Sequence, residues 1–151
     1  MKRSIPLIIL VLTLVAIHSA ARPSYAQATD VTGNWSGTTR VTPPCSQRCD
    51  AVNNITFGFD QQGDTIKGKY TCAYGNKICR NGGADNTGKI VSGRISGKQL
   101  RFSVVLPADA SNCDYNCILT SATTARGAYS CYQGGELVEQ GSWDVKRAPA
   151  Q

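Results

Sequence analysis

Seven cysteines offer the most obvious chemistry in this chain, and almost no histidine accompanies them. The single histidine, His18, lies in an apolar segment near the start. Nucleophiles paired with histidine, histidine general bases and the usual zinc or copper sites all need an imidazole. The ten acidic residues are scattered, and Asp60, Asp64 and Asp85 stand in turn-like contexts. We therefore expect a protein that is not an enzyme, with no catalytic residues, no metal and no cofactor.

The first 26 residues have the pattern of a signal peptide. Lys2-Arg3 precede an apolar run from Ile5 to Ile17, and Ser24-Tyr25-Ala26 provides small residues for cleavage, with a second site after residue 28. The apolar run is too short to span a membrane comfortably. We expect export to the periplasm or the cell exterior, loss of His18, and no membrane segment after cleavage.

In an exported protein, cysteines are first interpreted as disulfides. The spacing favours three pairs, Cys45 with Cys49, Cys72 with Cys79, and Cys117 with Cys131 directly opposite it in a hairpin. Cys113 is then unpaired, as a spare thiol, the link of a disulfide dimer, or a reactive thiol. Pairing of Cys113 with Cys117 or a loop neighbour is an alternative. Metal binding by the cysteines is a weaker one, because oxidation consumes thiolates.

Alternating apolar and polar residues predict eight short strands and no helix. The expected strands cover residues 32–41, 52–60, 64–73, 88–96, 99–106, 116–121, 126–132 and 138–146. Short and long connections alternate, as an up-and-down meander requires. We predict one domain, residues 29–147, that forms an eight-stranded antiparallel β-barrel, followed by a flexible tail at 148–151. A seven-strand sandwich is the main alternative.

Two hairpins fix the expected pairing of these strands. In the first, a turn centred on Gln62-Gly63 places Phe59 opposite Ile66. In the second, around Gly97-Lys98, Ile95 faces Leu100 and Val91 faces Val104. The long connections of a meander share one end, so we expect all seven cysteines to lie at one mouth of the barrel.

The inward face by parity is strongly apolar. Its aromatic members are Trp35, Phe57, Phe59, Tyr70, Phe102, Tyr129 and Trp143, and its aliphatic members are Ile55, Ile66, Val91, Ile95, Leu100, Val104, Leu119 and Val145. Glycine precedes an aromatic residue by two positions at Gly33, Gly68, Gly127 and Gly141, which leaves room for rings from neighbouring strands. An interior of eight strands is only wide enough for side chains or one small ligand.

The first strand carries a family resemblance. Gly33-Asn34-Trp35 resembles the Gly-x-Trp signature of lipocalins, and Thr32-Gly33-Asn34-Trp35 with Gly68-Lys69-Tyr70-Thr71 is similar to the opening strands of avidin-type barrels. The resemblance implies a calycin-type barrel that binds a small apolar molecule or biotin. The later tryptophans of the avidin biotin site have no match here, and Arg147 corresponds only loosely to the late arginine of lipocalins.

Two functional hypotheses follow. The first is a barrel that binds a small hydrophobic ligand in or at its mouth, with Trp35, Phe57, Tyr70, Phe102, Tyr129 and Trp143 as the contact residues; the bland alternative is that these rings simply fill the interior. The second is a protein-binding module or secreted enzyme inhibitor that uses the disulfide-tied loops, whose basic residues are Arg48, Lys77 and Arg80.

Nucleic acid is not an expected partner. Loss of Lys2, Arg3 and Arg22 with the leader lowers the formal net charge from +6 to +3. The aromatic residues face inward and do not interleave with the outward cations, which are interpreted as a solvated surface. Those cations are Lys67, Lys69, Arg101 and Lys146.

Overall fold

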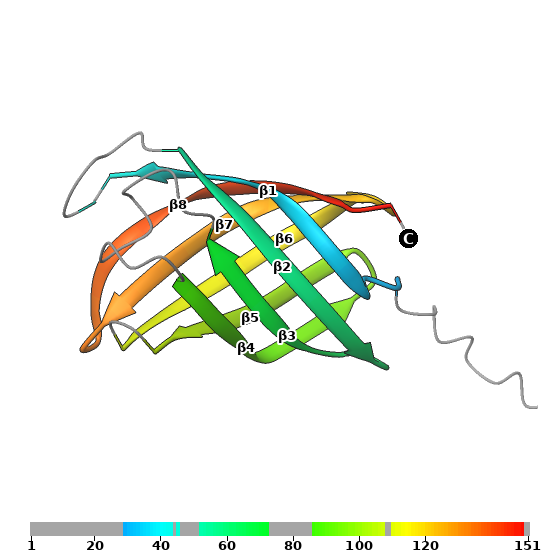
Figure 1. Cartoon of the computed structure of the whole chain (residues 1–151), viewed down its shortest axis with the longest axis horizontal. Helices are drawn as coiled ribbons and strands as arrows, with labels where there is room; N and C mark the ends of the chain where they lie inside the picture. Colours follow the sequence, from blue (N-terminus) through cyan, green and yellow to red (C-terminus); the bar gives the residue numbers. More distant parts are fainter. Residues whose placement is uncertain (1–28, 44, 46–51, 73–85, 108–109, 150–151) are drawn as a thin grey trace, which may run out of the picture.

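The chain folds as a closed, eight-stranded antiparallel barrel in strict sequential order (Figure 1). The computed structural model describes residues 29–43, 45, 52–72, 86–107 and 110–149. The strands are β1 (Gly33–Thr42), β2 (Val52–Gln62), β3 (Thr65–Cys72), β4 (Asn86–Ser96), β5 (Gln99–Leu106), β6 (Ser111–Ser121), β7 (Thr124–Gln133) and β8 (Glu136–Arg147). Pairing of β1 with β8 closes the ring, so neither strand is left as an edge. The predicted fold class is confirmed. The predicted signal peptide lies outside the described residues.

The first hairpin has the predicted faces and a different register. Phe59 pairs with Gly68 and Phe57 with Tyr70, so the predicted pairing of Phe59 with Ile66 is wrong by two residues. The two-residue turn consists of Gly63 and Asp64, and Gly63 supplies the positive φ of +64° at its first position. A slip of two keeps every side chain on its face, which is why the inward set survives the error.

A β-bulge in β4 overturns the predicted position of Val91. Ile95 pairs with Leu100 as expected, but the register shifts between Ile90 and Ser92, and Ile90 pairs with Val104. Ile90 is therefore buried, while Val91 is 52% exposed on the outer wall. The extra residue of a bulge exchanges the two faces beyond it.

The sixth strand begins earlier than predicted, and this changes the disulfide pattern. Cys113 is inside β6 and pairs across the sheet with Cys131, to which it is disulfide-bonded; Cys117 pairs with Gly127 and is a buried free thiol. The predictions that Cys117 bonds Cys131 and that Cys113 is unpaired are wrong. Cys113 is therefore not available as a dimer link or a reactive thiol. Cys45 and Cys72 are also disulfide-bonded, but Cys49 and Cys79 lie outside the described residues.

Cys117 also departs from the predicted clustering of cysteines at one end. It is the register partner of Leu100, next to the β4–β5 turn, whereas Cys72 and Cys131 lie at the opposite end of the barrel. Burial raises the pKa of the Cys117 thiol to about 12, which keeps it protonated and a poor nucleophile.

The core is a continuous set of inward side chains dominated by aromatic rings. Phe57 lies at its centre, with five ring centroids between 5.1 and 5.5 Å from its own. Of the glycines predicted to make room for rings, Gly141 does so, whereas Gly68 makes room for the backbone of the neighbouring strand. A Cβ at Gly68 would collide with the carbonyl oxygen of Gly58, and one at Gly141 would lie 2.8 Å from the Tyr129 ring.

Trp35 anchors the end of the barrel where the described chain begins. Its indole N–H donates to the Val31 carbonyl oxygen at 2.8 Å, and the Arg147 guanidinium lies 5.4 Å from the ring centroid. Arg147 also donates to the carbonyl oxygens of Asp30 and Thr32. These contacts hold the segment before β1 against this end of the barrel. The contact between Arg147 and the Trp35 ring is a cation–π interaction.

Candidate functional site

Several inward side chains at one end of the barrel are polar, in contrast to the apolar interior below them. This is the end where β1, β3 and β7 finish and β2, β6 and β8 begin. We call it the cysteine-tied mouth and define it by six residues, Thr39, Asn53, Cys72, Cys113, Cys131 and Glu139. Thr39 and Asn53 are buried polar residues, only 3% and 4% exposed. Buried polar side chains are normally hydrogen-bonded, so each of these two is expected to have a hydrogen-bond partner.

Three tyrosines reach the mouth from the aromatic core. Tyr115 stacks between Tyr129 and Phe102, with centroid distances of 5.6 and 4.9 Å. The hydroxyls of Tyr115 and Tyr70 lie near enough for each to affect the pKa of the other. The Tyr129 hydroxyl donates to Glu139 Oε1 at 2.9 Å, and Thr39 lies near enough to lower the pKa of Tyr129 slightly against its overall rise. A carboxylate and three phenols are thus brought together above packed rings.

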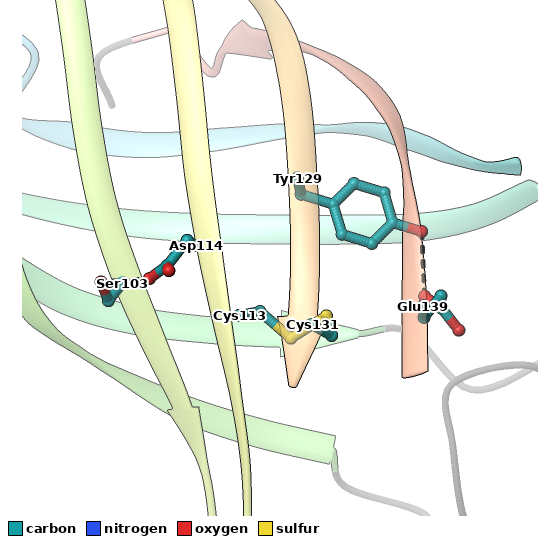
Figure 2. The surroundings of a disulfide bond; sticks show 6 residues. All are labelled: Ser103, Cys113, Asp114, Tyr129, Cys131 and Glu139. Atoms are coloured by element: carbon teal, nitrogen blue, oxygen red, sulfur yellow. Dashed lines mark hydrogen bonds between the residues drawn. A yellow bond between two sulfur atoms is a disulfide. The ribbon is translucent and has the colours of Figure 1, made fainter. Parts of the chain in front are cut away.

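Figure 2 shows how the strands hold this arrangement. Tyr129 points across from β7 to Glu139 on β8, and the Cys113–Cys131 disulfide joins β6 to β7 beside it. Cys131 is also the register partner of Glu139. The crosslink therefore fixes the β7 backbone from which Tyr129 projects, and β8, which carries Glu139, is paired with that strand.

Asn53 is the unsatisfied member of the mouth. It is the register partner of Thr39, and its side-chain oxygen is buried without a hydrogen-bond partner in the described part of the chain. Leaving a buried acceptor unpaired costs about 1–3 kcal/mol. A hydrogen-bond donor supplied by a bound molecule would recover that cost, so this oxygen is a candidate ligand contact.

Burial and the nearby carboxylate keep the phenols neutral. Desolvation is the main cause that raises the pKa of Tyr70, Tyr115 and Tyr129, and the charge of Glu139 adds to it in each case. Neutral phenols can both donate and accept hydrogen bonds. The cluster can therefore recognise a polar group of a ligand without presenting a phenolate.

The raised pKa values predict unfolding at alkaline pH. Below the unfolded-state pKa of about 10, folded and unfolded chains both hold these protons, so stability does not depend on pH through them. Above it, the unfolded chain releases protons that the folded chain retains, and stability falls as pH rises. We expect the phenolate absorbance of Tyr70, Tyr115 and Tyr129 to appear together with loss of far-ultraviolet circular dichroism. Phenolate formation by these residues with the β-signal intact would contradict the prediction.

The six predicted ligand-contact residues are all buried and joined through ring contacts. Phe57 contacts Tyr70, Phe102 and Trp143, and Tyr129 connects to them through Tyr115. Trp35 contacts Phe59 at the far end. Of these six residues, Tyr70 and Tyr129 are the two that reach the cysteine-tied mouth. The residues of the protein-binding alternative, Arg48, Lys77 and Arg80, lie outside the described part.

Sequence reasoning missed four residues that lie at the cysteine-tied mouth or reach it. Tyr115 was assigned to a loop, although Ser111, Cys113, Tyr115, Cys117 and Leu119 alternate with polar residues at the period of a strand. That alternation was the available signal. Thr39, Asn53 and Glu139 have the composition of ordinary strand or turn residues, and only closure of the ring brings them together.

The described residues include no cluster of metal ligands and no helix that could span a membrane. Within that part of the chain, no three residues among His, Cys, Asp and Glu are grouped so that they could hold a metal ion. It also contains no helix with the length and apolar character needed to cross a membrane.

Comparison with known proteins shows the fold. No family model and no curated protein matches the chain. A redesigned β-barrel, b11L5F_LGL, superimposes with a TM-score of 0.60 at 12% identity, covering 78% of this chain and 90% of the other. EF1p2_mFAP2b bound to DFHBI gives a TM-score of 0.59 at 12% identity, covering 78% and 93%. The chain is thus similar to small β-barrels, and neither a lipocalin nor an avidin family is identified.

Proposed function

We propose that this chain is an exported, non-enzymatic barrel that binds a small, mostly apolar molecule at the cysteine-tied mouth. The ligand carries a hydrogen-bond donor that reaches Asn53, and its apolar body rests against the rings of Tyr70 and Tyr129. The Cys113–Cys131 disulfide is compatible with the oxidising compartment that export implies. EF1p2_mFAP2b, a barrel of similar fold, is bound to DFHBI, which agrees with ligand binding in principle.

The observation that carries the proposal is the buried, unpaired oxygen of Asn53, which lies across the sheet register from Thr39 at the end of the barrel that holds the Tyr129–Glu139 hydrogen bond. Ligand sites combine an apolar lining with a few placed polar groups. An interior that only had to be filled would gain stability from an apolar residue at position 53. Retention of the amide therefore supports recognition of a donor.

The test separates binding from stability by using a matched pair of variants. Candidate ligands such as oleate, retinol, protoporphyrin and biotin are first screened for an increase in Tm. For a compound that stabilises the protein, Asn53→Leu is expected to weaken binding about tenfold, the loss of one buried hydrogen bond. The same change should leave the ligand-free barrel at least as stable, because it removes the unpaired oxygen.

Asn54→Leu is the control, since Asn54 is the exposed neighbour of Asn53 on the same strand. This variant should bind with unchanged Kd by isothermal titration calorimetry. The proposal fails if no compound of this class raises Tm, or if the two variants bind equally well.

A further inference from the structure

Three adjacent strands present an outer wall of uniformly positive charge. β3, β4 and β5 contain five cationic residues and no acidic residue. All five side chains are exposed, namely Lys67, Lys69, Lys89, Arg94 and Arg101. We call these residues the basic wall. Their side chains point outward, whereas inward side chains form the cysteine-tied mouth, so the two are distinct.

The pairing within the basic wall works against stability. Lys69 is directly opposite Lys89, and Arg94 is directly opposite Arg101. Like charges at directly opposed positions destabilise a sheet by a few tenths of a kcal/mol or more. On the other side of the ring, Arg126 of β7 is opposite Asp144 of β8, which is the favourable arrangement. The fold therefore accommodates opposite charges elsewhere and keeps two repulsive pairs here.

The acidic residues next to the wall neutralise only part of it. Asp60 on β2 is opposite Lys67, and Asp64 in the β2–β3 turn bonds Arg94 at 2.9 Å. Both members of the Asp64–Arg94 pair are largely exposed, so its contribution is small. Lys69, Lys89 and Arg101 have no acidic partner opposite them in the sheet registers.

The wall borders a hollow on the outside of the barrel. The hollow has a volume of about 900 Å³ and extends over β3 to β7, at the level of the β4 bulge. Its cations are Lys67, Arg94 and Arg101; its polar residues include Ser92 and Asn116; and its apolar contacts are Val91 and Tyr132. Asp114 also lines it, and accepts a hydrogen bond from Ser103 at 2.6 Å. The hollow thus combines positive charge with apolar contacts.

We propose that the basic wall and its hollow bind an extended acidic polypeptide segment of a partner protein. Carboxylates would meet Lys69 and Arg101 and relieve both repulsive pairs, while an apolar side chain would contact Val91, which the bulge turns outward. A nucleic acid strand needs aromatic platforms for its bases, and Tyr132 is the one exposed aromatic residue in the hollow. A flat membrane surface would not fill a hollow. A polypeptide fits all of these features.

The experiment measures anisotropy of a fluorescent peptide rich in glutamate with interspersed valine, added to the full mature protein. Binding is expected at low ionic strength and should weaken as salt is added. Lys69→Gln with Arg101→Gln should weaken binding about tenfold while leaving Tm unchanged or higher, because it removes both repulsive pairs and keeps the Arg94–Asp64 bond. Arg40→Gln with Lys146→Gln removes the same charge from β1 and β8, and should change Kd less than twofold.

Binding of a different class of partner would contradict the proposal. Tighter binding of single-stranded DNA or of anionic phosphatidylglycerol vesicles than of the acidic peptide would overturn the assignment to a polypeptide. Equal loss of affinity in the two double variants would mean that net charge alone explains the binding, and this would overturn the proposed site. These measurements do not involve Asn53, so their failure and that of the proposed mouth site are distinguishable.

Discussion

Phe57→Ala is expected to destabilise the barrel by about 3–5 kcal/mol, which is a large part of the stability of a domain this size. The Phe57 side chain is fully buried and contacts five other rings, two of them edge-on and one stacked. Truncation loses the transfer free energy of the ring and leaves a cavity, and the surrounding rings cannot collapse into it because each is fixed by its own strand. Urea denaturation followed by tryptophan fluorescence measures the change.

Val91→Ala is the control for this prediction. Val91 was predicted to face inward, yet it is 52% exposed after the β4 bulge. Its truncation should therefore change the free energy of unfolding by less than about 0.5 kcal/mol. A cost near 2 kcal/mol at Val91, or a cost below 1 kcal/mol at Phe57, would contradict the packing described above.

The fold could be predicted because apolar and polar residues alternate along each strand, and this alternation is visible in the sequence. Alternation identifies the two faces, and the faces fix which side chains enter the ring. The pairing of one strand with the next is less determined, because a slip of two residues preserves every face. Phe59 illustrates this: its predicted inward position is confirmed, but it lies opposite Gly68 instead of Ile66. The sequence did not indicate whether Gln62-Gly63 or Gly63-Asp64 forms the two-residue turn.

The errors that mattered arose where alternation breaks or is obscured. The bulge at Val91 leaves no mark in the composition of the sequence. In the sixth strand, the polar residues of Ser111–Asn116 resemble a loop, so the strand was started five residues late. That one boundary moved Cys113 out of the sheet, hid Tyr115, and led to the wrong disulfide partner for Cys131.

The candidate site was less predictable than the fold because it depends on contacts between strands far apart in the sequence. Thr39 and Tyr129 meet only because β1 closes against β8 beside β7. Nothing in the local sequence of either strand indicates that the two residues come together. The basic wall, in contrast, depends on neighbouring strands, and its charges can be read directly from three consecutive segments once the register is known.

Removing the Cys113–Cys131 disulfide is expected to cost about 3 kcal/mol, the chain-entropy value for a crosslink with its sequence separation of 18. The double variant Cys113→Ala with Cys131→Ala is compared with Cys117→Ala by thermal and urea denaturation. Cys117→Ala keeps the crosslink and should cost about 1 kcal/mol, the loss of a small buried group. Disulfide mapping of the unreduced protein should recover a peptide that joins positions 113 and 131.

The same variant also tests whether the crosslink organises the mouth. Cys131 is the register partner of Glu139, and the hydrogen bond from Tyr129 to Glu139 links the same two strands. Loss of the disulfide should therefore weaken ligand binding by more than the change in stability explains, because the polar side chains lose their fixed spacing. A barrel that loses stability but binds the ligand with unchanged Kd would show that the disulfide only staples the β6–β7 hairpin. Greater destabilisation by Cys117→Ala than by the double variant would contradict the pairing itself.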